Sequence, residues 1–215
     1  MAAVRQLATR AGCTAAYIEH ALTAAEADAA FRACAALPWR VETDAFGLQS
    51  RPTYYVGDPH CTFSYVGLRL PPQPWTPELL EMRARVAAAI DRPAEALTGV
   101  LLNNYPVGSG SIPWHYDEVR AHGAENLIAT LSLGGPRRFR LRPRDGSGDD
   151  IMEVEMTPGS VVMMAGATQD HYEHELPLRE GDPPRISLTF RSIVPGFEDA
   201  LATANDLCVE DAKPR

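Results

Sequence analysis

Long hydrophobic runs, paired cysteines and lysine are all scarce in this sequence of 215 residues. No stretch reaches the run of about 18 apolar residues that a membrane-spanning helix requires. The N-terminal segment also lacks the charged start and long apolar core of a secretory signal. These absences argue against a membrane protein or a secreted protein, and they predict a cytoplasmic one.

The cysteines are too dispersed for a zinc ribbon or a disulfide framework. There are four of them, at Cys13, Cys34, Cys61 and Cys208. They are widely separated and lack CxxC spacing, so we expect reduced thiols. Lysine is scarcer still, because Lys213 is the only lysine among 20 basic residues. Together with the abundance of alanine, this bias indicates a GC-rich bacterial genome, an inference that concerns coding rather than function.

Length and patterning favour a single domain over residues 1–215, mainly β with supporting α-helices. A capping-box pattern before an alanine-rich stretch predicts a helix over roughly residues 24–36. A Thr-Pro-Glu start at Thr76, followed by an apolar stripe that runs to Ile90, predicts a second helix. Between residues 100 and 191, short apolar or alternating runs are broken by Gly and Pro, which is typical of a double-sheet jelly roll.

The most informative pattern is His115-Tyr-Asp117, followed at a distance by His174. Residues two apart on or beside a strand point to the same side, so one short segment can supply two ligands. His174 lies beyond an apolar stretch, residues 161–164, that reads as a core strand. Two imidazoles and one carboxylate hold a ferrous ion on one face and leave positions open for oxygen and an organic co-substrate. By itself His-x-Asp is a weak signal, because it occurs by chance in many proteins.

Further motifs surround this pattern. They are Leu-Asn-Asn-Tyr-Pro-Val-Gly at 102–108, Ile-Pro-Trp-His-Tyr-Asp-Glu at 112–118, Leu-Ser-Leu-Gly-Gly at 131–135, Arg-Phe at 138–139, a strand at 159–164, His-Glu-Leu-Pro at 174–177 and Arg-Ile-Ser-Leu-Thr-Phe-Arg at 185–191. In sequence and in order they resemble the blocks of the AlkB-type iron(II)/2-oxoglutarate dioxygenases. The resemblance runs from about residue 51 to residue 191 and does not cover the two ends of the chain.

The resemblance implies a double-stranded β-helix (jelly roll) backed by the two helices, with residues 40–75 as a substrate lid. It also implies iron(II), 2-oxoglutarate as co-substrate, and O2. The implied catalytic residues and metal ligands are His115, Asp117 and His174. His171 is a rival third ligand, but the family's ligand precedes the x-hydrophobic-Pro corner. That rule selects His174 and leaves His171 as a supporting or buried polar residue.

Two arginines at the end of the family pattern suggest how the co-substrate is bound. Arg185 and Arg191 lie six positions apart, so on a strand they face the same way. A guanidinium offers a planar fork that binds a carboxylate through two hydrogen bonds. The resemblance implies that Arg185 and Arg191 bind 2-oxoglutarate and that Asn103 and Tyr105 add hydrogen bonds. The plainer alternative is a pair of exposed strand arginines, because Arg is mostly a surface residue.

The implied substrate contacts come mainly from the lid. They are Arg51, Tyr55, Phe63, Tyr65 and, outside the lid, Glu118. In the family's nucleic-acid demethylases, the residue at the place of Tyr65 stacks on a flipped base, and the iron-ligating imidazole packs on its other face. Such stacking is worth about 1–3 kcal/mol per base. The alternative is that these aromatic side chains fill the core beneath the lid.

Two departures count against a routine repair enzyme. The family's base-reading carboxylate lies two residues after the metal-binding Asp, where this chain has Val119. Glu118 is the nearest substitute, but it would point elsewhere. The net charge is −8, whereas a surface that grips a nucleic-acid duplex is normally basic.

An arginine stretch offers a local exception to this acidity. Arg138, Arg140, Arg142 and Arg144 alternate onto one face of a predicted strand. We call these four residues the arginine stripe. The arginine stripe either contacts phosphates or is the solvated face of a strand at a sheet edge, where charge discourages aggregation.

The sequence therefore predicts an iron(II)/2-oxoglutarate-dependent dioxygenase that removes alkyl groups from nucleobases in DNA or RNA, presented as a single strand or a flipped base. The alternative enzyme is an AlkB-like hydroxylase or demethylase that acts on a small molecule or a peptide. A non-catalytic nucleic-acid binder is a third reading, and the intact set of His115, Asp117, His174 and Arg185 argues against it. The sequence does not indicate an oligomeric state.

Overall fold

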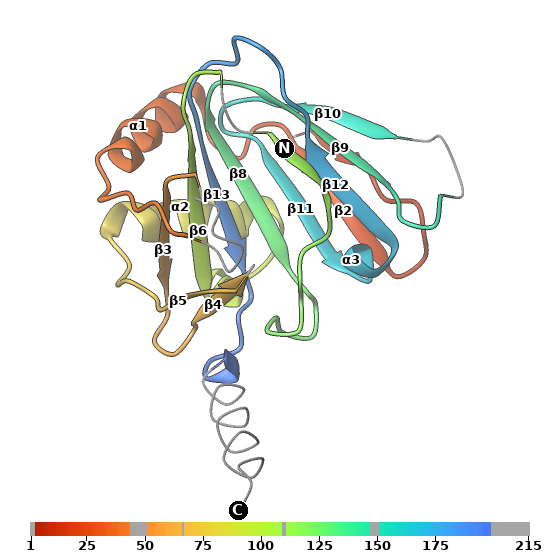
Figure 1. Ribbon diagram of the computed structural model, residues 1–215, viewed down its shortest axis with the longest axis horizontal. Helices are drawn as coiled ribbons and strands as arrows, with labels where there is room; N and C mark the ends of the chain where they lie inside the picture. The colour runs from red at the N-terminus through yellow and green to blue at the C-terminus, as the bar shows by residue number, and fades with distance from the viewer. Residues whose placement is uncertain (1–2, 44–50, 66, 109–110, 147–150, 199–215) are drawn as a thin grey trace, which may run out of the picture.

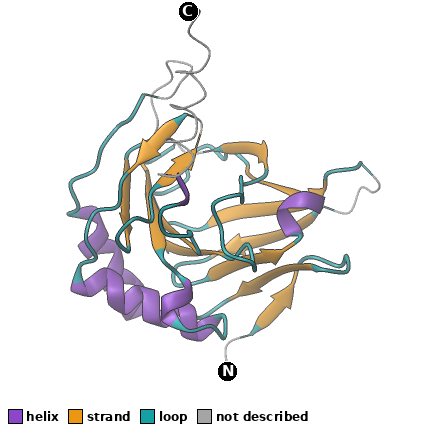
Figure 2. Ribbon diagram, turned by 90° about the horizontal axis from the view of Figure 1, so that it is seen from below, coloured by secondary structure: helices purple, strands orange, loops and turns teal. Residues whose placement is uncertain are grey.

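The structure, a computed structural model, describes residues 3–43, 51–65, 67–108, 111–146 and 151–198. Two β-sheets face each other, and helices cover the outer face of the larger one (Figures 1 and 2). The expected mainly β jelly roll with supporting helices is confirmed. Within the described ranges, no helix is both long enough and apolar enough to cross a membrane.

The strands form two main sheets and one small one. The larger sheet has seven strands in the order β1 (Val4–Gln6), β2 (Cys13–Ile18), β11 (Val161–Gly166), β8 (Ile128–Gly134), β13 (Arg185–Arg191), β6 (Gly99–Tyr105) and β3 (Thr53–Gly57). The smaller sheet has four, in the order β10 (Met152–Met156), β9 (Arg137–Pro143), β12 (Tyr172–Leu176) and β7 (Ile112–His115). Two short strands, β4 (Phe63–Tyr65) and β5 (Leu68–Leu70), pair with each other.

Both predicted helices are present and begin where their capping residues stand. The helix α1 (Ala24–Ala35) starts after Thr23, whose backbone N–H donates to the Glu26 carboxylate while the Glu26 N–H donates to the Thr23 hydroxyl, a reciprocal capping box. The helix α2 (Pro77–Ala89) starts with proline at its first position and with Thr76 as N-cap. Two short elements were not predicted, namely α3 (Thr168–His171) and a 3-10 helix, η1 (Ala94–Ala96).

Strand β13 lies between β8 and β6, and it separates the core from the space between the sheets. All seven of its residues are buried. Its alternate residues Ile186, Leu188 and Phe190 belong to the main apolar core, together with side chains of α1 and α2. The other residues face a cavity between the two sheets; they are Arg185, Ser187, Thr189 and Arg191. The twofold alternation of a strand thus gives β13 one structural face and one polar face.

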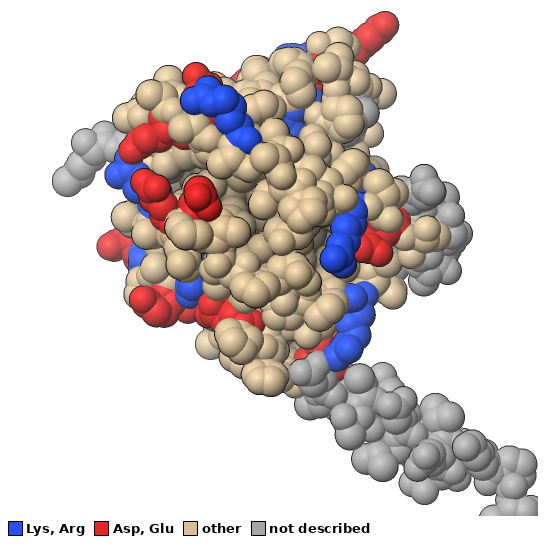
Figure 3. All heavy atoms as spheres, turned by 90° about the vertical axis from the view of Figure 1, so that its left-hand side faces the viewer, with Lys and Arg blue, Asp and Glu red and all other residues tan. Residues whose placement is uncertain are grey.

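Charge is dispersed on the side of the molecule that lies to the left in Figure 1. Acidic and basic side chains are interspersed there around a broad uncharged area (Figure 3). In the described part of this face, basic side chains do not gather into a patch. This face therefore offers no stripe of positive charge that would favour a nucleic-acid duplex.

One glycine at the end of β8 allows helix α1 to pack closely on the sheet. Gly134 has φ +79°, and a Cβ there would lie 2.6 Å from a ring carbon of Phe31 and 2.7 Å from the backbone oxygen of Pro184. Gly134 also pairs with Arg185 of β13. Side chains larger than hydrogen at this position would displace α1 or the start of β13.

We expect Gly134→Ala to lower the free energy of unfolding, measured by urea denaturation, through two effects. The left-handed backbone costs about 1–3 kcal/mol, and the overpacking against Phe31 costs about 1–3 kcal/mol more. Gly146→Ala is the matched control, because Gly146 has φ +66° but nothing within 4 Å of the added Cβ. Equal losses in the two variants would contradict the proposed role of Gly134 in packing.

Candidate metal and co-substrate site

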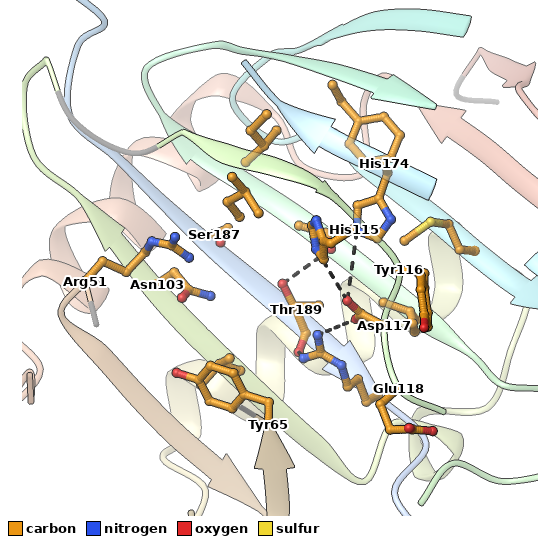
Figure 4. A pocket seen from close by; sticks show the side chains of 18 of the residues that line it. Arg51, Tyr65, Asn103, His115, Tyr116, Asp117, Glu118, His174, Ser187 and Thr189 are labelled. Carbon is orange, nitrogen blue, oxygen red and sulfur yellow. Dashed lines mark hydrogen bonds and ion pairs between the residues drawn. The ribbon is translucent and has the colours of Figure 1, made fainter. Parts of the chain in front are cut away.

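Three side chains converge at the inner face of the smaller sheet. His115 ends β7 and His174 lies directly opposite it on β12, with ring centroids 4.2 Å apart. The Oδ1 atom of Asp117 is 3.6 Å from Nε2 of His115 and 4.0 Å from Nε2 of His174. The ligand atoms of the three all lie within 4.8 Å of one another (Figure 4). Two imidazoles and one carboxylate at this spacing can hold one metal ion, and they suit iron(II).

A hydrogen bond at His115 and burial at His174 leave both imidazoles able to act as metal ligands. Nδ1 of His115 lies 2.9 Å from the carbonyl oxygen of Pro113. Because a carbonyl can only accept, Nδ1 donates, and Nε2 keeps its lone pair toward Asp117. Burial lowers the pKa of His174 to about 4, so its ring is neutral at pH 7. The ring of Phe139 stacks on His174, with centroids 5.6 Å apart.

Asp117 is held by its side chain and by its backbone. Nη2 of Arg191 donates to Oδ2 of Asp117 at 2.6 Å, and the backbone N–H of Asp117 donates to the side-chain oxygen of Gln169 at 2.8 Å. Burial alone would raise the pKa of Asp117, but the positive charge of Arg191 and the hydrogen bond that it donates hold the pKa well below its usual range. The carboxylate is therefore ionised, with Oδ1 directed toward the two imidazoles.

Arg185 has the features of a buried carboxylate-binding residue. It is 1% exposed, and its Nε donates to Oγ of Ser132 at 2.8 Å. Its Nη1 is buried and has no hydrogen-bond partner among the described residues. Burial lowers the pKa of Arg185, against the opposing effect of Tyr105. A buried guanidinium with an unused donor beside a cavity fits one carboxylate of 2-oxoglutarate.

The other predicted co-substrate residues lie in the same cavity, with one difference. Asn103 and Tyr105 line it from β6, and the ring of Tyr105 lies 5.0 Å from the guanidinium of Arg185. Arg191 lines it as well, but its Nη2 donates to Asp117. Arg185 and Arg191 are both buried, so the alternative of two exposed strand arginines is wrong.

The predicted lid is only partly described, because residues 44–50 and residue 66 lie outside the described ranges. Phe63 and Tyr65, both on β4, line the cavity and stack on each other with centroids 5.4 Å apart. In Figure 4 Tyr65 lies across the cavity from His115. Arg51 also lines the cavity and lies near Asn103 in that view.

Tyr55 does not line this cavity, contrary to the prediction of a substrate contact. It is 6% exposed, and its hydroxyl donates to the carbonyl oxygen of Cys61 at 2.5 Å. Its ring packs against Phe63, with centroids 5.7 Å apart. Tyr55 therefore belongs to a small apolar cluster beneath Phe63. At this one position the plainer alternative, an aromatic side chain that fills the core, is correct.

Predictions were also made for Glu118, Val119 and His171, and the structure agrees with only some of them. Glu118 lines the cavity, but its side chain is 58% exposed and lies 3.3 Å from the guanidinium of Arg120. Val119 packs against an apolar cluster, so no carboxylate stands at that position. His171 is exposed at the end of α3, so of its two alternatives, a supporting or a buried polar residue, the buried one is wrong. The structure brings His174 into the metal-binding group and leaves His171 out.

The arginine stripe lies on the outer face of the smaller sheet and is largely neutralised. Arg138 and Arg140 contact Glu153 at 3.2 and 3.4 Å, Arg140 also contacts Glu175 at 2.7 Å, and Arg142 contacts Glu173 at 2.6 Å. Strand β9 lies between β10 and β12, so the alternative of a sheet-edge strand is wrong. The acidic side chains of the neighbouring strands explain why these three arginines do not form a basic surface.

Several residues of the site were not predicted from the sequence. Ser132 supports Arg185, and Gln169 supports Asp117. Thr130 and Thr189 line the cavity and hydrogen bond to each other at 3.4 Å. A signal for two of them existed, because Thr130 and Ser132 are polar residues at alternate positions of an otherwise apolar strand. Gln169 had no such signal, since it lies on the short helix α3.

Comparison with known proteins finds similar chains. A family model described as the 2OG-Fe(II) oxygenase superfamily matches residues 14–191. The "DNA oxidative demethylase ALKBH2" of Bos taurus is 34% identical over 146 residues, which are 65% of this chain and 51% of that protein. The "Alpha-ketoglutarate-dependent dioxygenase alkB homolog 3" of Bos taurus is 30% identical over 183 residues, which are 79% of this chain and 63% of that protein. The chain thus spans less than two thirds of the length of either relative.

A solved structure, "The structure of OsALKBH1", superposes with a TM-score of 0.59 at 18% identity and covers 86% of this chain and 100% of that one. At this identity the similarity supports the fold alone. The two relatives named above come from a eukaryote, so the predicted bacterial source gains no support from them.

Removing a metal ligand should abolish metal binding. We expect His174→Ala to lose iron(II) binding, measured by titration of the purified protein under anaerobic conditions, because two of three ligands hold the ion poorly. His171→Ala is the matched control and should bind as the unaltered protein does, since His171 is exposed and outside the group. Loss of binding in His171→Ala with retention in His174→Ala would show that the third ligand is misassigned.

The contribution of Arg185 can be tested with a change that keeps its charge. Arg185→Lys loses the planar fork and the hydrogen bond to Ser132, so the KM for 2-oxoglutarate should rise about tenfold or more, as the loss of about 1.5–3 kcal/mol implies. The KM is measured from the steady-state rate of succinate formation at varied 2-oxoglutarate concentration. An unchanged KM would show that another residue binds this carboxylate of 2-oxoglutarate.

Proposed function

This chain belongs to the 2OG-Fe(II) oxygenase superfamily, and from that membership we propose that it oxidatively removes alkyl groups from nucleobases in DNA or RNA. The predicted resemblance to AlkB-type dioxygenases is confirmed by its similarity to ALKBH2 and to alkB homolog 3. Membership implies iron(II), 2-oxoglutarate and O2. One relative's name, DNA oxidative demethylase, supports an alkylated nucleic acid as the substrate.

One observation carries this proposal. The three predicted ligands, the unused donor of Arg185 and the aromatic rings of Phe63 and Tyr65 line the same cavity of about 440 Å³. Cavities of this size commonly hold a small ligand. When bound, iron(II), 2-oxoglutarate and O2 supply the oxidising power that hydroxylates a C–H bond, and a hydroxylated N-methyl group then breaks down to formaldehyde and the free base. The protein supplies binding, orientation and a water-poor surrounding.

The residues of the larger sheet orient the co-substrate in this proposal. Arg185 binds the carboxylate far from the metal, because its unused Nη1 is buried beside the cavity. Asn103 and Tyr105 add hydrogen bonds from the neighbouring strand β6. Arg191 keeps the Asp117 carboxylate ionised and in place, since it donates to Oδ2 and leaves Oδ1 for the metal.

The substrate base enters from the side of β4. Tyr65 is partly exposed and lies across the cavity from His115 (Figure 4), and in this proposal a planar base binds between the phenol ring and the imidazole. Phe63 supports Tyr65 from beneath, because the two rings stack and Phe63 is only 6% exposed. The guanidinium of Arg191 lies 4.5 Å from the centre of the Phe63 ring, a cation–π contact that helps to hold that ring in place.

A second candidate function is hydroxylation or demethylation of a small molecule or a peptide. It is favoured by the charges of the cavity, because Asp117 and Glu118 are the carboxylates among the described lining residues and Asp117 is already paired with Arg191. Glu118 is turned to solvent and to Arg120, so a buried carboxylate that reads a base edge is missing from the described lining. A cationic methylated base would therefore find little charge compensation there.

We also propose that residues 1–215 act as one domain, that residues 40–75 cover the bound substrate, and that the protein works in the cytoplasm. Within these residues β4 and β5 pair with each other and β4 lines the cavity, whereas β3 is a strand of the larger sheet. Cysteines Cys34 and Cys61 are free and buried, as expected for a reducing compartment.

The nucleic-acid proposal is tested by removing the ring of Tyr65, which is proposed to stack on the base. Tyr65→Ala should lower kcat/KM for a methylated single-stranded oligonucleotide about tenfold or more, because base–aromatic stacking is worth about 1–3 kcal/mol. This kcat/KM is measured from the rate of formaldehyde release. Tyr65→Phe keeps the ring and should retain most of the activity, and the KM for 2-oxoglutarate should change little in either variant.

The alternative function gives a different result with the same assay. A small-molecule hydroxylase would release no formaldehyde from methylated oligonucleotides, and unmethylated oligonucleotides would not compete for its site. Activity of Tyr65→Ala equal to that of the unaltered protein would reject stacking by Tyr65.

A further inference from the structure

An exposed aromatic side chain stands at the mouth of the cavity, between two of the predicted metal ligands. Tyr116 is 51% exposed and lines the cavity. Figure 4 shows it beside Asp117. Neither the apolar core nor the metal-binding group accounts for it, since Tyr116 belongs to none of the core clusters and offers no ligand to the group.

A guanidinium covers part of this ring. The central carbon of Arg144 lies 3.6 Å from the centre of the Tyr116 ring, a close cation–π contact. Nη1 of Arg144 donates to the carbonyl oxygens of Gln169 at 2.9 Å and Asp170 at 3.3 Å. The side chain of Gln169 also accepts the backbone N–H of Asp117 at 2.8 Å. One residue of α3 therefore fixes both Arg144 and the segment that carries Tyr116.

Arg144 differs from the rest of the arginine stripe in its charge compensation. The other three members each have a glutamate within 3.4 Å. Within the described ranges no carboxylate forms an ion pair with Arg144, whose partners are two carbonyl oxygens and an aromatic ring. Among the described residues its Nε and Nη2 atoms have no hydrogen-bond acceptor, which leaves them available to an anion. An arginine of this kind, next to an exposed ring, suits a phosphodiester and the base attached to it.

We propose that Tyr116 and Arg144 form a subsite for the nucleotide that flanks the target nucleotide. The exposed part of the Tyr116 ring stacks on the flanking base, and Arg144 binds its phosphodiester through the donors that α3 leaves unused. The subsite deepens the proposed function and rests on it. It gives the enzyme a preference for a strand over a single nucleoside, although the chain is acidic and most of the arginine stripe is neutralised.

The test compares a methylated single-stranded oligonucleotide of about ten nucleotides with the corresponding methylated nucleoside. Tyr116→Ala should lower the ratio of kcat/KM for the oligonucleotide to that for the nucleoside about tenfold, as the loss of one stacked base implies. Tyr116→Phe keeps the ring and should restore the ratio. A ratio unchanged in Tyr116→Ala would overturn the stacking part of the proposal.

Arg144→Gln tests the phosphate contact through salt dependence. The slope of log Kd for the oligonucleotide against log salt concentration should fall by about 0.7, the value expected for one phosphate contact on a single strand. Arg142→Gln removes the same charge from the same stripe, but Arg142 is neutralised by Glu173, so its slope should stay at that of the unaltered protein. Equal changes of slope in the two variants would show a general charge effect and overturn the phosphate contact.

The same experiment separates this proposal from the function on which it rests. If the unaltered protein turns over the methylated oligonucleotide and none of the variants at Tyr116 or Arg144 alters its selectivity or salt dependence, the subsite alone is rejected. If the unaltered protein neither binds nor demethylates the oligonucleotide, the proposed function is rejected, and the subsite with it.

Discussion

The ion pair between Arg191 and Asp117 is the contact on which the site depends. It joins the end of β13 in the larger sheet to the segment after β7 in the smaller one, with 2.6 Å between donor and acceptor. Both side chains are largely buried. A buried ion pair contributes little net stability, because desolvation offsets the attraction, but breaking it leaves an uncompensated charge. Its main effect here is positional, since it fixes one carboxylate oxygen and leaves the other directed toward the two imidazoles of the candidate metal group.

The rest of the site follows from strand alternation on two facing sheets. On β13 every second side chain enters the cavity, so one strand supplies Arg185 at one end and Arg191 at the other. On the opposite sheet, the pairing of His174 with His115 places the two imidazoles side by side. The proposed co-substrate end and the candidate metal end of the cavity are therefore separated by the length of one strand. The buried apolar face of β13, packed under α1 and α2, makes this arrangement rigid.

Much of this arrangement was predictable, because its signals are local. Capping residues determine where α1 and α2 begin, and His-x-Asp needs only a strand to direct both side chains to one side. The pairing partners of charged and aromatic side chains were not predictable, since they depend on strand neighbours distant in sequence. For the arginine stripe the sequence left phosphate contact and a solvated edge strand as alternatives, because it does not show that Glu153 and Glu173 lie beside these arginines. Tyr55 read as a substrate contact, but it packs beneath Phe63.

The central claim is that the group formed by His115, Asp117 and His174 carries out oxidative removal of alkyl groups from nucleobases. Its most direct test is the stoichiometry of products formed from an N-methylated single-stranded oligonucleotide in the presence of iron(II), 2-oxoglutarate and O2. The account predicts that formaldehyde and succinate appear in equal amounts, together with the unmethylated base, and that neither appears when iron(II) is removed. Succinate without formaldehyde, at a rate that the oligonucleotide does not change, would contradict it.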